Sequence, residues 1–460
     1  MSHRHTTDLT QGRIRNQLIQ FAIPLMLGNL FQLSYNMVDT IVIGRFAGST
    51  SLAAVGTCDQ IMNLLILGVS GVCIGASVLM GNFFGARDLE RLREEMATTL
   101  SLGLIFAAIV MAAGLPLAPA IFRLMNVQPE ALDEASVYLR IIFLGMPFTC
   151  LYNIYGAALR SVGDARTPVR FLIVSCLINI LLDLALVAWA RLGVLGAALA
   201  TAAAQGISAL LCIRHVNRNV PELRIPWKHL RINGRLARRT LSYGSLTALQ
   251  QCAQPIGNII IQGSVNTLGI SAAAAYSAVR KIEDIGLLPG RSISSAMTAF
   301  IAQNEGAGNH GRTEEGYRKG MLLELLAGIC ISAVVLLLRR PLMSLFTTED
   351  VMISLGVHYF DIIGFCYWLP HLSNGLQGYY RGVGAMKSSL LGSLTQISIR
   401  VILTLLLVPT MGIGGVGVAC VAGWTGMLAW GLPWQRVLFR RAREKRAVHD
   451  GPPWCAGNRT

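Results

Sequence analysis

The chain has 460 residues, of which 53% are hydrophobic and only 14% are charged, and its formal net charge is +15. A soluble domain usually carries about 25% charged residues, so this composition excludes an ordinary soluble enzyme or binding domain. The net charge would suggest nucleic-acid binding in a soluble protein, but most basic residues here lie in alternate loops between apolar segments, which indicates membrane orientation instead.

The apolar segments are long enough to cross a bilayer. A spanning helix needs about 20 apolar residues, and residues 61–80, 100–118 and 321–338 approach or reach that length. Strict alternation of apolar and polar residues, which strands would need, is absent. We therefore predict an all-α polytopic membrane protein with twelve spans. The predicted spans are residues 18–43, 57–80, 96–118, 134–158, 168–189, 193–213, 241–264, 277–302, 320–338, 355–379, 388–408 and 412–435.

Lysine and arginine are distributed unequally between the two sides of this topology. One side carries 29 of them, the other side carries six, and four lie inside the predicted spans. Because cytoplasmic loops carry the excess of basic residues, we expect both termini in the cytoplasm. The segment 1–17 is polar and basic, unlike a cleavable signal peptide. The expected location is the bacterial inner membrane.

The second half of the chain repeats landmarks of the first at a constant offset in residue number. Two halves that each have an even number of spans begin on the same side, so their pseudo-two-fold axis should lie along the membrane normal. The matching landmarks are Gly48 with Gly269, Gly85-Ala86 with Gly306-Ala307, Asn153 with Asn374, Arg160-x-Val162-Gly163 with Arg381-x-Val383-Gly384, and Gly193 and Gly196 with Gly414 and Gly417.

This repeat divides the chain into two lobes. We expect six spans over residues 1–215 and six over residues 239–436, with a cytoplasmic linker at 216–238 and a basic cytoplasmic tail at 437–460. The linker contains Pro221, Pro226 and many basic residues. A transport pathway between the lobes is typical of such duplicated membrane proteins.

Ionisable residues within the first half mark a candidate cation site. A carboxylate at the centre of a membrane helix costs about 2.5–3.5 kcal/mol on insertion scales. Asp39 lies in the first span, Asn179 and Asp183 share one face of the fifth, and Thr201 lies in the sixth. Two close carboxylates resist losing both protons, so the pair could hold a proton, and the same oxygens could bind Na⁺. The alternative for Asp39 is a structural one, in which it lies near the end of its helix and its carboxylate extends to the water at the membrane surface.

Pro24 lies in the body of the first span and removes the hydrogen-bond donor for the carbonyl of Gln20. It could bend a moving helix or be a purely structural kink. At the offset of the repeat, the cation-site positions become Ile260, Arg400, Thr404 and Ala422. Ion coupling is therefore expected in the first half alone.

Polar residues in the second half have two interpretations. Arg280 can reach Glu283 or Asp284, and Lys281 can reach Asp284, at helical spacing. These residues could neutralise one another near an aqueous mouth or have a role in the pathway. Glu324 or Asp361 could pair with Arg400. Membrane amides could line a substrate cavity or hold helices together. The predicted pathway residues are Tyr35, Asn36, Asn153, Gln250, Asn258, Lys281 and Asn374.

The sequence has no motif that supports catalysis or a phosphate-binding loop, so we predict no enzyme activity and no cofactor. An ion gradient is then the expected energy source. The ten cysteines lie almost all in apolar segments and form no Cys-x-x-Cys pair, so we interpret them as packing residues.

Several motifs resemble the multidrug and toxic compound extrusion (MATE) family along nearly the whole chain, about residues 8–436. They are Leu9-Thr10-Gln11-Gly12, Tyr35-Asn36-x-Val38-Asp39-Thr40, Leu52-Ala53-Ala54-Val55-Gly56, Leu159-Arg160-x-Val162-Gly163-Asp164-x-Arg166-Thr167-Pro168, Asn179-Ile180-x-x-Asp183 and Gln303-Asn304-x-Gly306-Ala307-Gly308. The resemblance implies two six-helix lobes around a V-shaped cleft, and export of organic, often cationic, compounds in exchange for Na⁺ or H⁺.

The resemblance also assigns roles to residues. Asp39, Asn179, Asp183 and Thr201 match the cation site of the family's N-terminal lobe, and Pro24 matches its first-helix proline. Some members depend instead on acids in spans seven and ten. This chain has no acid in span seven, and Pro370 stands where the span-ten acid is expected, so it resembles the N-lobe-coupled bacterial type.

We therefore expect a multidrug efflux antiporter that acts as a monomer on small organic cations or drugs and contacts membrane lipids but not nucleic acid. A lipid-linked oligosaccharide flippase of a related two-lobed fold is the alternative. It would need a cationic cavity, for which Arg280, Lys281, Arg291 and Arg400 are candidates. A membrane enzyme or scaffold is the third possibility, and the missing catalytic motifs disfavour it.

Overall fold

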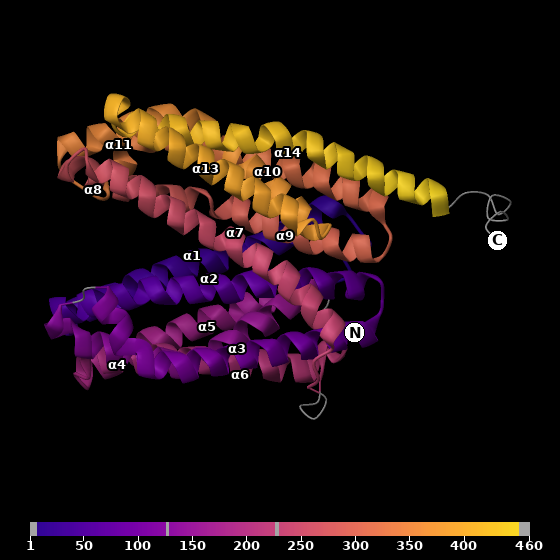
Figure 1. Ribbon diagram of the computed structural model, residues 1–460, viewed down its shortest axis with the longest axis horizontal. Coiled ribbons are helices and arrows are strands. Elements are labelled where there is room, and N and C mark those ends of the chain that lie inside the picture. The colour runs from indigo at the N-terminus through magenta and orange to yellow at the C-terminus, as the bar shows by residue number, and fades with distance from the viewer. Residues whose placement is uncertain (1–6, 126–127, 226–229, 450–460) are drawn as a thin grey trace.

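The computed structural model describes residues 7–125, 128–225 and 230–449, which form helices without any strand (Figure 1). The first half contains α1 (Ile14–Phe46), α2 (Ser49–Gly85), α3 (Leu89–Leu124), α4 (Pro129–Ser161), α5 (Arg166–Asp183), the π-helical η1 (Leu184–Trp189) and α6 (Gly193–Asn219). The short η2 (Pro221–Leu223) follows. The second half contains α7 (Gly234–Asn266), α8 (Ile270–Gly286), α9 (Leu288–Gly306), α10 (His310–Ser344), α11 (Asp350–Ile363), η4 (Gly364–Cys366), α12 (Trp368–Gly382), α13 (Met386–Met411) and α14 (Ile413–His449).

The twelve predicted spans fall on twelve helical segments, two of which are interrupted. Span eight is divided into α8 and α9, and span ten into α11 and α12, which meet at an angle of 52°. Within the described residues, nine helices are long and apolar enough to cross a membrane, and the bent pair is a tenth. The remaining two segments, α7 and α8 with α9, are more polar because they face a cavity between the lobes.

The two predicted lobes are visible as separate bundles that converge toward one end (Figure 1). The boundary segments are more helical than the sequence indicates. The predicted linker at 216–238 begins inside α6 and ends inside α7, and its residues 226–229 lie outside the described part. The predicted tail starts within α14, which continues to His449, and residues 450–460 are likewise outside the description.

The converging end, which we call the closed end, is held by contacts between backbones of the two lobes. A Cβ on Gly85 would lie 1.9 Å from the carbonyl oxygen of Gln303, and a Cβ on Gly306 would lie 1.9 Å from that of Asn82. Asn82 and Gln303, like the two glycines, occupy equivalent positions of the repeat. The contact is therefore reciprocal, as a pseudo-two-fold axis between the lobes requires, and it confirms the predicted repeat.

The segments that carry the family resemblance meet at this end. The amide of Leu9 donates to Oε1 of Gln303 at 3.0 Å, and the Gln303 side-chain amide donates to the carbonyl of Ser161 at 2.8 Å. The side-chain amide of Asn304 donates to the carbonyl of Leu9 at 3.2 Å. Both Gln303 and Asn304 are fully buried. The N-terminal segment, the end of α4 and the end of α9 thus form one hydrogen-bonded junction.

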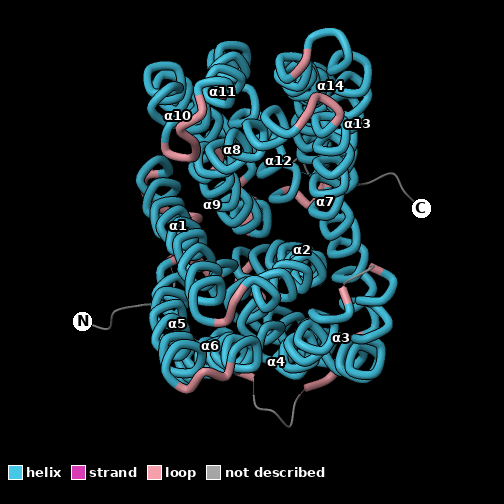
Figure 2. Tube along the Cα trace, turned by 90° about the vertical axis from the view of Figure 1, so that its left-hand side faces the viewer, coloured by secondary structure: helices cyan, strands magenta, loops and turns pink. Residues whose placement is uncertain are grey.

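Helix α1 belongs to both lobes. Leu18 and Phe21, near its beginning, pack into the core formed mainly by α8 to α14. Val42 and Ile43, near its end, pack into a core of the first lobe. Pro24 lies near the end of the part packed on the second lobe, where Leu25 also packs, and α1 runs through it as one helix. Figure 2 shows α1 along the side of both bundles.

The reciprocal glycine contact gives the first testable prediction. Gly85→Ala should destabilise the closed end by about 1–3 kcal/mol, since the new methyl group would overlap the Gln303 carbonyl unless the backbones separate. Amide hydrogen exchange in residues 82–88 and 303–309 should rise, and the thermal unfolding temperature should fall.

Gly56→Ala is the matched control, because Gly56 lies in the same helix and a Cβ there meets nothing within 4 Å. Alanine is a better helix former than glycine by about 1 kcal/mol, so this variant should be at least as stable as the parent chain. Equal exchange rates in the two variants would show that the glycine contact does not hold the lobes together.

Candidate functional site

The predicted cation-site residues come together where α1, α5 and α6 meet. The carboxyl groups of Asp39 and Asp183 are neighbours, close enough for each to influence the charge of the other. Tyr35, one turn before Asp39 on α1, interacts with both carboxyls and lies beside the hydroxyl of Thr201 on α6. Asn179 lies one turn before Asp183 on the same face of α5. The side chains predicted from the sequence thus surround one point in the first lobe.

Local sequence features fix the position of α5. Oδ1 of Asp164 accepts hydrogen bonds from the backbone amides of Arg166 and Thr167, which satisfies donors that the start of the helix leaves free. In the middle of the helix, the hydroxyl of Ser175 donates to the carbonyl of Ala204 at 2.8 Å. Alanine-rich α6 permits this close approach, as small residues do between membrane helices.

The backbone changes its winding directly after Asp183. Residues 184–189 are π-helical, and the amide of Ala190 donates to the carbonyl of Ala185. Such wide turns occur frequently at functional sites in helices. This one places the second carboxylate at the junction between two helical geometries.

The polar atoms of this site are buried without hydrogen-bond partners. Asp183 is 0% exposed and Asn179 is 1% exposed. Among the described residues, neither carboxyl oxygen of Asp183, neither amide atom of Asn179, nor Oδ1 of Asp39 has a partner. An unsatisfied buried polar group costs about 1–3 kcal/mol, so this arrangement is unfavourable unless a proton or cation engages it.

The donor set suits a hard ligand. Carboxylate, amide and hydroxyl oxygens are those that hard cations prefer, and a pair of carboxyls can also share a proton. Within the described residues, no group of three or more histidine, cysteine, aspartate or glutamate side chains could hold a metal ion. The site therefore fits Na⁺ or H⁺ better than a transition metal.

Two residues near this site were missed by sequence reasoning. Asp59 of α2 lies within electrostatic range of Asp39, and Tyr138 of α4 lies within range of both Asp39 and Asp59. The sequence held a signal for Asp59, because it is an acid inside a predicted span. Tyr138 has no such signal, since aromatic residues are common in membrane helices.

A second feature is a cavity of about 500 Å³ between the lobes, within the usual size range of small-molecule sites. Most of its wall comes from α7, α8, α9, α12 and α13, and the first lobe contributes α2 and the end of α4. Three predicted pathway residues, Gln250, Asn258 and Asn374, line it. The closed end separates this cavity from the loops at 86–88 and 307–309.

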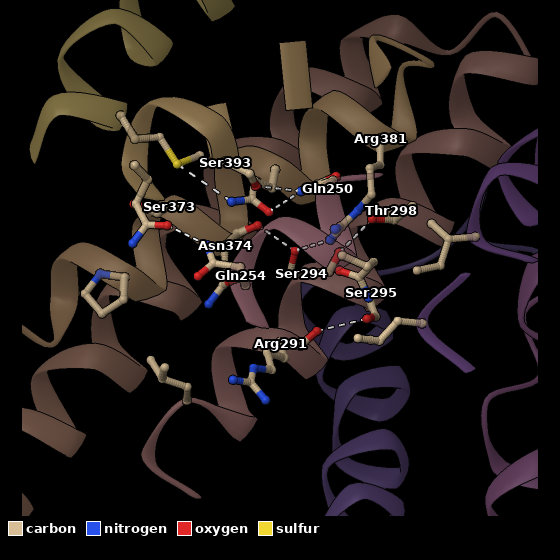
Figure 3. Close-up of a pocket in the computed structure, with 18 of the residues that line it drawn as sticks. Gln250, Gln254, Arg291, Ser294, Ser295, Thr298, Ser373, Asn374, Arg381 and Ser393 are labelled. Atoms are coloured by element: carbon tan, nitrogen blue, oxygen red, sulfur yellow. Dashed lines mark hydrogen bonds between the residues drawn. The ribbon is translucent and has the colours of Figure 1, made fainter. Parts of the chain in front are cut away.

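Amide and hydroxyl groups in the cavity wall are linked to one another (Figure 3). The Gln250 amide donates to Oε1 of Gln377 at 2.6 Å and to Oγ of Ser393 at 3.1 Å. Arg381 donates to Oγ of Ser294 at 2.8 Å, and that hydroxyl donates to the carbonyl of Asn374. These links come from α7, α9, α12 and α13 and hold the wall in shape.

The other predicted pathway residues lie elsewhere. Tyr35 belongs to the aspartate site, and Asn36 is on an exposed face of α1. Asn153 donates to the carbonyl of Thr149 within α4, and the amine of Lys281 lies over the ring of Phe346 at 5.9 Å. None of Asn36, Asn153 and Lys281 lines the cavity.

The expected charge pairs in the second half are partly wrong. Asp284 pairs with Arg291 at 3.0 Å, across the break between α8 and α9, and not with Lys281. Asp361 pairs with Arg339 at 2.9 Å, so it is not the partner of Arg400.

Glu324 is not the partner of Arg400 either. It is fully buried and has Arg381 as its cationic neighbour. The carboxylate near Arg400 is Glu283, which accepts a hydrogen bond from Tyr359. The partners of these charged residues are set by breaks within helices and by crossings between helices. Residue spacing along one helix does not describe either feature.

Comparison with known proteins identifies the family. A sequence profile of the MatE family matches residues 24–185 and 247–406, once in each lobe. The chain is 29% identical over 337 residues to the probable multidrug resistance protein YoeA of Bacillus subtilis, covering 72% of this chain and 73% of YoeA. It is 26% identical to the FAD transporter of Shewanella oneidensis, covering 77% and 78% of the two chains. A solved structure of an outward-facing multidrug resistance MATE family transporter superimposes with a TM-score of 0.89, at 23% identity, over 95% of this chain and 99% of that one.

The unpartnered carboxylate of Asp183 gives the second prediction. In Na⁺-free buffer, Asp183→Leu should raise the free energy of unfolding by about 1–3 kcal/mol, because it replaces a buried polar group that lacks partners with an apolar one. The measurement is the thermal unfolding temperature of the purified protein in detergent.

Ser175→Ala is the control on the same helix. Its hydroxyl is buried and has a partner, so its removal should lower stability by about 1 kcal/mol. If both variants lowered the unfolding temperature equally, the interpretation of Asp183 as a destabilising group would be wrong.

Proposed function

The chain belongs to the MatE family of membrane transporters, and we propose that it is a secondary antiporter that exports small organic compounds from a bacterial cell in exchange for Na⁺ or H⁺. The observation that carries this proposal is the pair of neighbouring carboxyls, half-buried Asp39 and fully buried Asp183, among membrane helices, with Oδ1 of Asp39 and both oxygens of Asp183 lacking hydrogen-bond partners. Intramembrane acids of this kind mark ion or proton pathways in transporters.

Alternating access gives the two ends of the molecule different roles. The closed end carries the loops that we expect to face the cytoplasm, so the cavity is shut off from the cytoplasm in this state. Separation of the lobes at the closed end, with approach at the other end, would expose the cavity to the cytoplasm for loading. One chain supplies both lobes and the cavity, so a monomer suffices.

Coupling would run through α1. This helix carries Asp39 and packs on both lobes, one at each end, so a change of charge at the site alters the packing of a helix that both lobes share. Loss of a proton, or binding of Na⁺, would favour the arrangement of α1 that best satisfies the new charge. A coupling free energy of about 1–3 kcal/mol is typical of such linkage and would suffice to shift the populations of the two states severalfold.

The residues of the site would have different roles in binding the proton or Na⁺. Asp39 and Asp183 would hold the proton or share Na⁺, and Asn179 and Thr201 would supply neutral oxygens. Tyr35 would orient the carboxyl of Asp39 from the same helix. Asp361, the acid nearest the position used by the C-lobe-coupled branch, is paired with Arg339 and about half exposed, which disfavours it as the coupling group.

The proposed substrate class at this stage is small organic compounds in general. The family resemblance implies compounds that are often cationic, whereas one relative is named for FAD, whose pyrophosphate is anionic. The substrates of transporters similar to this chain are therefore not all cations. The flippase alternative would also need a cationic cavity, but these relatives are named for multidrug resistance or for FAD transport.

The third prediction concerns ion coupling. In proteoliposomes, Asp39→Asn and Asp183→Asn should each reduce gradient-driven transport at least about tenfold, since an amide releases no proton and lacks the negative charge that balances Na⁺. Transport of one cationic and one anionic fluorescent dye should be followed under an imposed Na⁺ gradient and, separately, an imposed H⁺ gradient.

Asp361→Asn is the matched control and should retain coupled transport. Both cation-site variants should elute as the parent chain does on size exclusion, which separates loss of coupling from misfolding. Normal gradient-driven transport by Asp183→Asn, or transport by the parent chain that depends on neither ion, would falsify the antiport proposal.

A further inference from the structure

The cavity between the lobes is strongly cationic. Five arginines line it, at positions 160, 280, 291, 381 and 400, against two carboxylates, Glu283 and Asp284, so its formal charge is +3. Seven amide side chains, from Gln250, Gln251, Gln254, Asn258, Asn374, Gln377 and Gln396, complete the polar wall. Basic residues that only set membrane orientation lie in loops, whereas these line a cavity between two lobes.

Two of the arginines are related by the internal repeat. Arg160 lies in the last turn of α4 and Arg381 in the last turn of α12, and they occupy the same position of the duplicated Arg-x-Val-Gly sequence. Both line the cavity, one from each lobe. The duplicated motif therefore contributes a pair of arginines to the cavity wall, one on each side of the pseudo-two-fold axis.

The five arginines of the cavity differ in whether a carboxylate of the protein lies beside them. Arg291 has an ion pair with Asp284 at 3.0 Å, and Arg400 donates to Asn258 and Tyr276 beside Glu283. Arg160, Arg280 and Arg381 have no carboxylate within 4.0 Å among the described residues.

Within the described residues, neither Arg160 nor Arg381 has a negatively charged group in direct contact. Arg160 lies beside Tyr152 and two cysteines, which are neutral. Arg381 contacts Ser294, with Glu324 more distant. Arg280 lies within electrostatic range of Glu283, without an ion pair at contact distance. A negative ligand would therefore meet arginines that no carboxylate of the described residues pairs with at contact distance.

We propose that this cavity binds an organic anion that carries a phosphate or pyrophosphate group, with Arg160, Arg280 and Arg381 as the groups that recognise it. Guanidinium groups match phosphate oxygens in charge and in hydrogen-bond geometry. A formal charge of +3 favours an anion with two or three charges over a monovalent one, and repels the organic cations that the family resemblance implies. The amides would bind the neutral polar part of the same molecule. This inference rests on the proposed function as an exporter and names the substrate class.

Equilibrium binding tests the proposal without any ion gradient. The purified full-length protein in detergent at low salt is titrated with inorganic pyrophosphate, ADP, AMP and adenosine, and with tetraphenylphosphonium as an organic cation. Thermal stabilisation should follow the order of charge on the nucleoside series, ADP above AMP above adenosine, with no stabilisation by the cation. Farnesyl pyrophosphate distinguishes the sources: tighter binding than ADP indicates a lipid-linked substrate, and weaker binding indicates a water-soluble one.

Variants assign the binding to the cavity. Arg160→Gln and Arg280→Gln should each weaken ADP binding about tenfold, as expected for loss of a hydrogen bond between charged groups. Arg340→Gln is the control, because Arg340 is a mostly exposed arginine paired with Asp350 outside the cavity. Two variants from different lobes keep the test open if one of them fails to fold.

Two results would overturn the proposal. One is that neither pyrophosphate nor ADP stabilises the parent chain. The other is that both cavity variants bind ADP as the Arg340 variant does. Failure of the antiport proposal has a different signature, in which ADP binds but neither gradient drives transport. Gradient-driven transport of a cationic dye, without binding of either phosphate compound, would remove the anion proposal alone.

Discussion

The backbone contact between Gly85 and Gln303, with its mate between Gly306 and Asn82, is the constraint on which the arrangement of the lobes depends. Two helices can approach this closely only where the side chain is a hydrogen atom, so the contact is specific to glycine at both positions. Because the two halves of the contact are related by the repeat, they form or break together. This makes the closed end a two-state element, as alternating access requires.

Away from this junction, the two lobes carry different polar residues and form different candidate binding sites. The first lobe places two acids, Asp39 and Asp183, where α1, α5 and α6 meet. The second lobe supplies most of a cavity whose formal charge is positive. Helix α1 connects the acid site to both lobes, because its two ends pack in the cores of different lobes, and Pro24 removes one hydrogen bond from its backbone. The duplication thus supplies a symmetric frame, and the differences between its halves separate the two sites.

Much of this could be predicted from the sequence, for physical reasons. The spans were predictable because bilayer thickness sets the length of an apolar segment and because basic residues gather in the cytoplasmic loops. The repeat was predictable because its landmark residues recur at a constant offset. Asn179 and Asp183 could be placed together because they share one helix face. Contacts between helices were harder, because periodicity gives the face of a helix but not the neighbour that this face meets. The pairing of Asp284 with Arg291 depends on the break between α8 and α9, which Pro289 and Gly290 mark in the sequence but which the prediction of one continuous span passed over. Arg160 and Arg381 were recognised as a repeated motif, yet only the crossing of the lobes shows that they line one cavity.

The opposite signs of the two sites limit how coupling can work. A transporter whose substrate and coupling ion have the same charge can exchange them by direct repulsion, since each disfavours the other at short range. An anionic substrate near the arginines and a cation at Asp39 and Asp183 would attract each other, so electrostatics alone would favour their binding together. Antiport with such a substrate therefore requires that the cation and the anion stabilise different arrangements of the lobes by more than that attraction. Helix α1 carries Asp39 and packs in the cores of both lobes, so its packing is the candidate element for the difference between the two states.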